Sequence, residues 1–404
     1  MVRDAIKGEF IIKVIESFFG KGSFVIFSLF FTFTFTRLYG PELFGQYTYA
    51  YTVLSLLMIL AKAGLDNGLI YFMPKYGNKY VTLSFLISTL FTILIIFVSY
   101  FIINDTFLLL MLPLLFFITI EQLFFAIYRS IGKIKEYYFI NSFLSILLRV
   151  ILLTIFYFTL SNQILGIVLA VYISFITSNV IYFYQNQYRF KKIIYDKKYI
   201  MYSLSLVLAA MMSVVIDKID ILMIGVILEK KDVGIYQVAS QVATTTSIIL
   251  VIFNTVFAPK ISQLYHTGQI EKLKLIYVKS TRILAFLSFV IIFFISIFSK
   301  YILLIFGSAF IDGQIVLILR GTGQFINAAV GSVWLMLAMT GKPKLQMYGN
   351  LAACIINVVL NYLLIPIYGV NGAAFASMIA VGFVNILGYI LVSRQFKIKV
   401  YAVV

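Results

Sequence analysis

Charged side chains are scarce in this sequence. Asp, Glu, Lys and Arg make up 12% of the 404 residues, whereas a soluble domain carries about 25%. Hydrophobic residues make up 62%, and the mean hydropathy is +1.03. This composition excludes a soluble globule. A helix needs about 20 apolar residues to cross a ~30 Å hydrocarbon core, so the apolar residues suffice for about twelve spans.

Cysteine and histidine are almost missing, with one of each, Cys354 and His266. An internal disulfide and a cysteine-based zinc site are therefore excluded. The sequence also lacks a Gly-rich phosphate loop and a nucleophile elbow, and no outer loop exceeds about ten residues. These absences predict a protein that is not an enzyme and that needs no cofactor.

Hydropathy predicts an all-α integral membrane protein with about twelve transmembrane helices. The basic and then apolar N-terminal stretch lacks a small-residue cleavage site, so we expect it to be retained as the first span. The expected spans are 14–36, 43–65, 80–103, 106–128, 139–160, 163–184, 200–227, 233–257, 282–305, 313–339, 345–366 and 370–392.

Basic residues alternate between crowded and bare loops along these spans. One side collects 23 Lys and Arg and the other holds four, Arg37, Lys230, Lys231 and Lys300. Cytoplasmic loops accumulate Lys and Arg, so both termini are predicted to be cytoplasmic. The net charge of +17 then needs no nucleic acid partner to explain it.

Three short motifs recur in the same order at offsets of 189, 209 and 206 residues. The pairs are Gly45-x-Tyr47-x-x-Ala50 with Gly234-x-Tyr236-x-x-Ala239, Gly132-Lys133-x-Lys135 with Gly341-Lys342-x-Lys344, and Gly166-x-x-x-Ala170 with Gly372-x-x-x-Ala376. Because six spans separate the copies, the repeat is parallel, and a substrate site is expected between the halves. The predicted domains are a six-helix bundle at 1–190, a basic cytoplasmic linker at 191–199, and a second six-helix bundle at 200–404.

Ionisable residues at membrane depth are the sharpest functional signal, because each is costly unless it meets water or a partner. They are Lys13, Glu16, Lys21, Glu121, Arg149, Asp217, Lys218, Asp220 and Arg320. Lys13 and Glu16 are spaced to pair with each other, and a structural role is favoured for Glu121.

Arg149 lies in the middle of its span, where no acidic residue accompanies it. Arg320 heads a polar stripe in the outer half of a later span. Both are expected to face water or an anion; the alternative is an interhelical salt bridge to the acidic cluster 217–220. Lys21, Arg149, Lys218 and Arg320 would form a graded set of cations that a moving anion meets in turn.

Asp217 and Asp220 share a helix face beside Lys218. They either form a local ion-pair cluster or exchange a coupling ion, a proton or sodium. Two further spans carry polar stripes, which fit either a wet interior or interhelical hydrogen bonds. These stripes are Asn350, Cys354, Asn357 and Asn361, and Gln237, Gln241, Thr244 and Thr245.

Three segments carry a family resemblance. They are 36–47 (TRLYGPELFGQY), 217–220 (DKID) continuing to 233–239 (VGIYQVA), and 361–374 (NYLLIPIYGVNGAA). They resemble the polysaccharide-repeat flippases, of the O-antigen or capsule type, in the multidrug/oligosaccharidyl-lipid/polysaccharide (MOP) exporter superfamily.

This resemblance implies two six-helix bundles around a central cavity that opens alternately to either side of a bacterial plasma membrane. The substrate would be an undecaprenyl-diphosphate-linked oligosaccharide, moved from the cytoplasmic to the outer leaflet. Lys21, Arg149, Lys218 and Arg320 would match the family's cavity cations by depth and charge. The expected partners are this lipid-linked substrate, a coupling ion, membrane lipids and a polysaccharide polymerase. The alternatives are a cation-coupled multidrug antiporter of the same superfamily, a lipid II flippase, and a membrane-embedded glycan polymerase or transferase.

Overall fold

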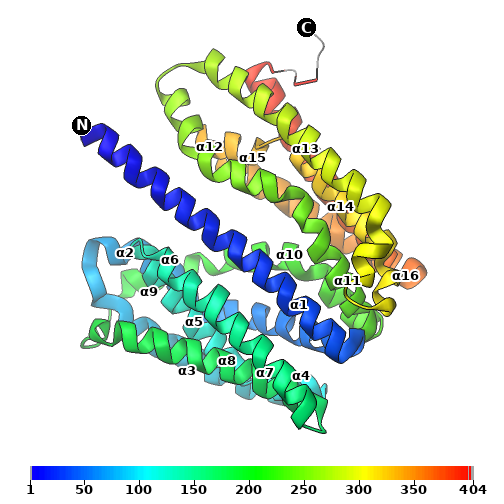
Figure 1. The fold of residues 1–404 in the computed structure, drawn as a ribbon. Coiled ribbons are helices and arrows are strands. Elements are labelled where there is room, and N and C mark those ends of the chain that lie inside the picture. Colours follow the sequence, from blue (N-terminus) through cyan, green and yellow to red (C-terminus); the bar gives the residue numbers. More distant parts are fainter. Residues whose placement is uncertain (1, 399, 402–404) are drawn as a thin grey trace. The chain divides into compact units, whose positions relative to one another are not determined.

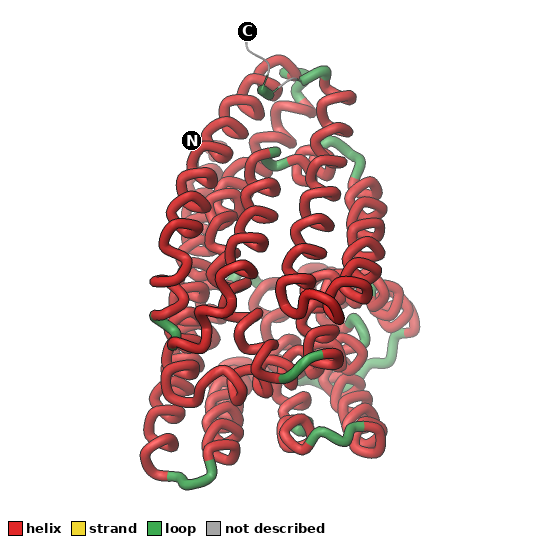
Figure 2. The backbone as a smooth tube through the Cα atoms, turned by 90° about the vertical axis from the view of Figure 1, so that its right-hand side faces the viewer, coloured by secondary structure: helices red, strands yellow, loops and turns green. Residues whose placement is uncertain are grey.

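The structure is a computed structural model. It describes the backbone of residues 2–398 and 400–401, and the side chains of residues 25–401 except those of 209, 213, 216, 255, 256, 343 and 399. The described residues form helices joined by short loops, with no strand among them (Figure 2). The chain divides into two compact units, Met1–Lys218 and Ile219–Val404, which are described separately.

Within its described residues, the first unit contains nine α-helices and the beginning of a tenth, with short 3₁₀ and π-helical segments between some of them (Figure 1). The α-helices are α1 (Val2–Lys62), α2 (Leu65–Tyr76), α3 (Val81–Ile102), α4 (Thr106–Met111), α5 (Leu114–Ser130), α6 (Ile134–Tyr138), α7 (Ile146–Thr159), α8 (Gln163–Asn186) and α9 (Lys197–Ser205), followed by α10 (Val207–Ile227), which runs into the second unit.

Helix α1 is a hairpin of two helical segments. At Gly40 the backbone adopts φ 76° and ψ −179°, a conformation that side chains with a Cβ disfavour, and Pro41 follows. The ring of Phe35 lies 5.3 Å from those of Phe44 and Tyr47. The residues before and after Gly40 therefore pack side by side, so the 61-residue helix reverses direction there.

Helix α3 shows how the surface is arranged. Its buried positions include Ser84, Ser88 and Thr92, whereas Leu90 and Phe97 are exposed. Polar residues turned inward with large apolar residues turned outward are the opposite of a water-soluble bundle, and they fit a surface covered by lipid.

The second unit contains six complete α-helices and two short 3₁₀ segments within its described residues. The α-helices are α11 (Lys230–Thr244), α12 (Ile248–His266), α13 (Ile270–Leu304), α14 (Gln314–Ala329), α15 (Val333–Met339) and α16 (Pro343–Phe396). Helix α14 packs against α11, α13 and α16, so it lies at the centre of this unit.

Helix α16 is a second hairpin. Gly369 has φ 57° and ψ −139°, and Pro366 lies one turn before it. Asn357 Nδ2 and Ser377 Oγ are 3.5 Å apart although 20 residues separate them along the chain. The two arms of α16 are therefore antiparallel.

Seven helices within the described residues are long and apolar enough to cross a membrane, or up to nine if each of two bent pairs is one span. Two of the seven are the hairpins, Val25–Lys62 with 38 residues and Lys344–Phe396 with 53 residues, and each hairpin is long enough for two spans. The chain is thus an all-α, multi-pass membrane protein. The count of twelve spans stays a prediction.

The boundary between the two units falls at Lys218 and Ile219, later than the predicted linker 191–199. Helix α9 begins within that linker, at Lys197, and packs on α2 of the first unit. A Cβ at Gly68 would lie 2.1 Å from Ser203 Oγ, which shows how closely the two helices approach. The two six-helix bundles stay a prediction.

Candidate functional site

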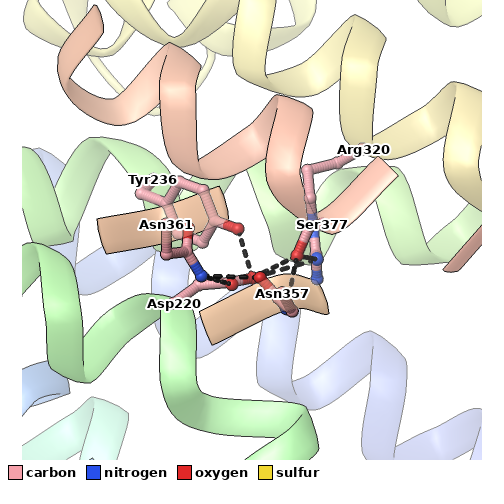
Figure 3. A network of polar contacts seen from close by, with 6 residues as sticks. All are labelled: Asp220, Tyr236, Arg320, Asn357, Asn361 and Ser377. Carbon is pink, nitrogen blue, oxygen red and sulfur yellow. Dashed lines mark hydrogen bonds and ion pairs between the residues drawn. The ribbon is translucent and has the colours of Figure 1, made fainter. Parts of the chain in front are cut away.

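A buried polar network lies inside the second unit, around Asp220 (Figure 3). Four helices supply its six residues: Asp220 from α10, Tyr236 from α11, Arg320 from α14, and Asn357, Asn361 and Ser377 from the two arms of α16. These positions are far apart in the sequence, and the packing of α14 against α11 and α16 brings them together.

Both oxygens of the Asp220 carboxylate accept hydrogen bonds. Asn361 Nδ2 donates to Oδ1 at 2.8 Å, and the Tyr236 hydroxyl donates to Oδ2 at 2.6 Å. Ser377 also donates to Oδ2. Arg320 Nη1 completes an ion pair with Oδ2 at 3.2 Å.

The network continues from the carboxylate in two directions. Arg320 Nη1 donates to Ser377 Oγ at 2.6 Å, and its guanidinium carbon lies 5.8 Å from the centre of the Tyr236 ring. Asn361 donates to Asn357 Oδ1 at 2.6 Å. Both oxygens of this buried carboxylate therefore have hydrogen-bond donors, and Arg320 supplies the one cation that pairs with it among the described residues.

Arg320 therefore forms an interhelical salt bridge to the acidic cluster 217–220, which was the alternative to facing water or an anion. The side chain of Asp220 is 6% exposed and that of Arg320 is 17% exposed, so water screens this pair little. Asp217, three residues before Asp220, is exposed on α10, and Lys218 is partly buried.

The first unit contains a second buried arginine, Arg149 on α7, which is 8% exposed. Its Nε donates to Ser174 Oγ at 2.9 Å. The guanidinium carbon lies 4.6 Å from the ring centre of Phe175 and 5.5 Å from that of Phe31. Two aromatic faces thus stabilise the cation and restrict its side chain.

Glu121 on α5 is a buried carboxylate that interacts with Arg149 over a longer distance than an ion pair. It accepts hydrogen bonds from Asn141 Nδ2 and, at 3.3 Å, from the Tyr137 hydroxyl. It interacts electrostatically with Arg149, but within the described residues no carboxylate oxygen lies within 4.0 Å of the Arg149 nitrogens. Its Oε2 is buried without a hydrogen-bond partner in that part of the chain. Arg149 and Glu121 are therefore coupled charges and not a contact ion pair.

The repeated sequence motif supplies one tyrosine to each buried charge cluster. Tyr47, of the first Gly-x-Tyr-x-x-Ala copy, interacts with Arg149 through its hydroxyl. Tyr236, of the second copy, donates to Asp220 and lies under Arg320. Sequence analysis singled out the repeat but missed both tyrosines as site residues, although their place in the repeat was the available signal.

The predicted site residues are thus distributed over the chain. Asp220 and Arg320 come together in the second unit, and Arg149 lies in the first. The side chain of Lys21 lies outside the described residues. Within the described part of the chain, no three His, Cys, Asp or Glu side chains gather as ligands for a metal ion.

Known proteins resemble this chain in sequence and in fold. The family model described as polysaccharide biosynthesis protein matches residues 13–265, and the MatE model matches residues 205–363. A Haloferax volcanii protein named "Probable low-salt glycan biosynthesis flippase Agl15" is 24% identical over 181 residues. That match spans 45% of this chain and 38% of the relative.

Two solved structures share the fold over almost the whole chain. An inward-facing multidrug resistance MATE family transporter of the MOP superfamily is 15% identical, with a TM-score of 0.75, and covers 93% of this chain and 94% of that one. The lipid II flippase MurJ, in an inward closed conformation, is 16% identical, with a TM-score of 0.74, and covers 95% and 87%. The fold is therefore that of MOP superfamily transporters, and the match over residues 13–265 shows that the chain belongs to the polysaccharide biosynthesis protein family.

Proposed function

We propose that this protein is a flippase that moves a lipid-linked oligosaccharide across the membrane for polysaccharide synthesis. The carrier would be undecaprenyl diphosphate, and the direction would be from the cytoplasmic to the outer leaflet of a bacterial plasma membrane. The family match and the transporter fold support this class of function. The buried Arg149 carries the argument for an anionic substrate.

Arg149 has the chemistry to bind a diphosphate. Its Nε donates to Ser174 Oγ. A guanidinium can bind a phosphate through two parallel N–H donors, and the two Nη groups of Arg149 would supply them. The rings of Phe31 and Phe175 hold the cation in an apolar setting, where its attraction to an anion exceeds that in water. Within the described residues, no carboxylate forms a contact ion pair with it.

The network in the second unit suggests how an ion could be coupled to this movement. Protonation of Asp220, or binding of sodium to it, would weaken its ion pair with Arg320. The released guanidinium would then be available to the substrate anion. Asp217 and Lys218 lie on the same helix as Asp220, α10. We propose that Asp217 also takes part in ion coupling and that Lys218 and Lys21 also attract the substrate anion.

Replacing Arg149 tests the proposal directly. Arg149→Ala should leave the protein in the membrane at near-normal abundance and block flipping, so that lipid-linked repeats accumulate in the cytoplasmic leaflet. Arg149→Lys should restore part of the activity, because lysine keeps the charge without the planar, bidentate geometry. Arg129→Ala, at an exposed arginine near the end of α5, is the matched control and should flip normally.

A purely structural Arg149 would give a different pattern. Arg149→Ala would then lower abundance, because the buried Glu121 would lose its electrostatic interaction with this cation. Adding Glu121→Gln should in that case restore the abundance. Flipping at normal rate and abundance by Arg149→Ala would remove this residue from the site.

The MatE match over residues 205–363 favours one other candidate, a cation-coupled multidrug antiporter. That protein would export cationic drugs. A deletion strain would then become drug-sensitive and would not accumulate lipid-linked sugars. The resemblance in fold to MurJ raises lipid II as a different flippase substrate. Analysis of which lipid-linked intermediate accumulates in the deletion strain separates these cases.

A further inference from the structure

Two grooves flank the short helix α9 in the first unit, one basic and aromatic and the other apolar. The basic groove has a volume of about 530 Å³. It is lined by Tyr71, Phe72, Lys75, Tyr76, Lys198 and Tyr202. The apolar groove has a volume of about 370 Å³ and runs along α3. Its lining includes Leu65, Ile87, Leu90, Leu94, Ile200 and Leu204.

Helix α9 is fixed between them by its buried side. Tyr199 is fully buried and stacks on Tyr80, with ring centres 4.4 Å apart and ring planes 3° apart. Asp196, just before α9, accepts a hydrogen bond from the Tyr80 hydroxyl at 2.5 Å. The two sides of α9 next to this anchored face therefore line different grooves: Lys198 lies in the basic groove and Leu204 in the apolar one.

The basic groove presents positive charge beside aromatic rings. Lys75 Nζ lies 5.1 Å from the ring centre of Tyr76, and the rings of Tyr71 and Tyr202 stack 4.5 Å apart. The carboxylate of Asp196 pairs with Lys79 at 4.0 Å. Within the described residues, no carboxylate forms an ion pair with Lys75 or Lys198, so the groove is open to an anion from outside the protein.

The two grooves lie at different depths in the membrane. With a rise of 1.5 Å per residue, the 22-residue α3 is about 33 Å long and can cross the hydrocarbon core alone. Tyr80, directly before α3, then lies at the interface, where tyrosine and lysine are enriched. Ile87 and Leu94 lie about 10 and 21 Å further along α3, so the apolar groove extends from the near leaflet to just past the middle of the hydrocarbon core.

We propose that this pair of grooves binds one anionic phospholipid, which straddles α9. The phosphate headgroup would lie between Lys75 and Lys198, and an acyl chain would lie in the apolar groove against Leu90 and Leu94. A lysine near the membrane surface attracts anionic lipid, and aromatic rings at the interface accommodate the glycerol region. Leu90 is 59% exposed and Leu94 is 55% exposed, so the apolar groove faces the lipid. This site is separate from Arg149 and does not depend on the proposed transport.

Binding of phosphatidylglycerol to the purified full-length protein tests the headgroup site. Native mass spectrometry in detergent should show retained phosphatidylglycerol in preference to phosphatidylcholine. Lys75→Ala with Lys198→Ala should weaken the apparent affinity for phosphatidylglycerol by roughly thirtyfold, the expected effect of two interfacial lysines. The matched control is Lys342→Ala with Lys344→Ala, two exposed lysines of the second unit, which should leave the affinity within twofold.

A tryptophan substitution tests the position of the acyl chain. Leu90→Trp should fill part of the apolar groove and weaken phosphatidylglycerol binding several-fold. Leu86→Trp, one turn earlier on α3 and outside the groove lining, should not.

Unchanged binding in the Lys75/Lys198 variant, or equal loss in the Lys342/Lys344 control, would overturn the headgroup site. Equal effects of the two tryptophan variants would overturn the acyl-chain placement. Preferential retention of an added polyprenyl diphosphate over phosphatidylglycerol would assign the grooves to that lipid and overturn the phospholipid.

Discussion

Removal of Arg320 should destabilise the second unit strongly, and neutralising Asp220 should reverse part of that loss. In Arg320→Ala the Asp220 carboxylate, 6% exposed, would lose its cation. An uncompensated buried charge costs about 3–5 kcal/mol. Tyr236, Ser377 and Asn361 would still donate to the carboxylate, so we expect the lower end, about 3 kcal/mol.

Asp220→Asn should cost less, about 1–2 kcal/mol. The guanidinium of Arg320 keeps its 2.6 Å hydrogen bond to Ser377, and its side chain is 17% exposed. In the double variant neither a buried carboxylate nor an arginine remains unpaired. The double variant should therefore be less destabilised than the sum of the single variants, by about 2 kcal/mol.

Thermal unfolding of the purified protein in detergent measures this cycle. A loss of about 3 kcal/mol corresponds to a midpoint lower by roughly 6–12 °C for a unit of this size. Arg394→Ala, an exposed arginine on α16, is the control and should change stability by less than about 0.5 kcal/mol. Additive effects of the Arg320 and Asp220 substitutions would refute the ion pair as the source of the stability.

Three other predictions concern the topology, the ion coupling and the pH dependence of α9 docking. A reporter active in the cytoplasm should be active when inserted at Lys192 or fused to the C-terminus, and inactive when inserted at Asp312; opposite results for the first two positions would refute the six-span repeat. Asp217→Asn with Asp220→Asn should weaken transport driven by a proton gradient while membrane abundance stays near normal, whereas unaffected transport would leave the pair a structural role. Chiefly because Tyr80 donates to it, Asp196 has a pKa below its usual value. Its contribution to α9 docking should be present above about pH 4 and be lost as the pH falls through the lowered pKa; proteolysis of the segment before α9 should show this acid dependence in the wild type and not in Asp196→Asn.

The pattern of residues within single helices was readable from the sequence. Asn357 and Asn361 were placed on one helix face by their spacing of four, and both are buried in the Asp220 network. Arg149 was singled out because no acid accompanies it in its span, and Glu121 indeed lies on a different helix, α5. Such predictions succeed because the helical period and the cost of a charge in lipid act locally.

The partners of these residues could not be read in the same way. The sequence left Arg320 open between an anion and an acidic residue, and only the packing of α14 against α16 and α11 places it on Asp220, 100 positions earlier. Ser377 gave no signal, because a lone serine in a membrane helix usually bonds to its own backbone.

The sequence by itself determined the class of the protein, its polar helix faces and the motifs that mark its family. Hydropathy and short motifs are properties of neighbouring residues, so they survive without knowledge of the fold. The tertiary structure alone decided which buried charge meets which partner, and that α9 packs on α2 and is bordered by a basic groove and an apolar one. Those outcomes depend on how helices distant in the chain pack together, because a side chain's hydrogen-bond partners and the depth of a groove are fixed only when the helices are assembled.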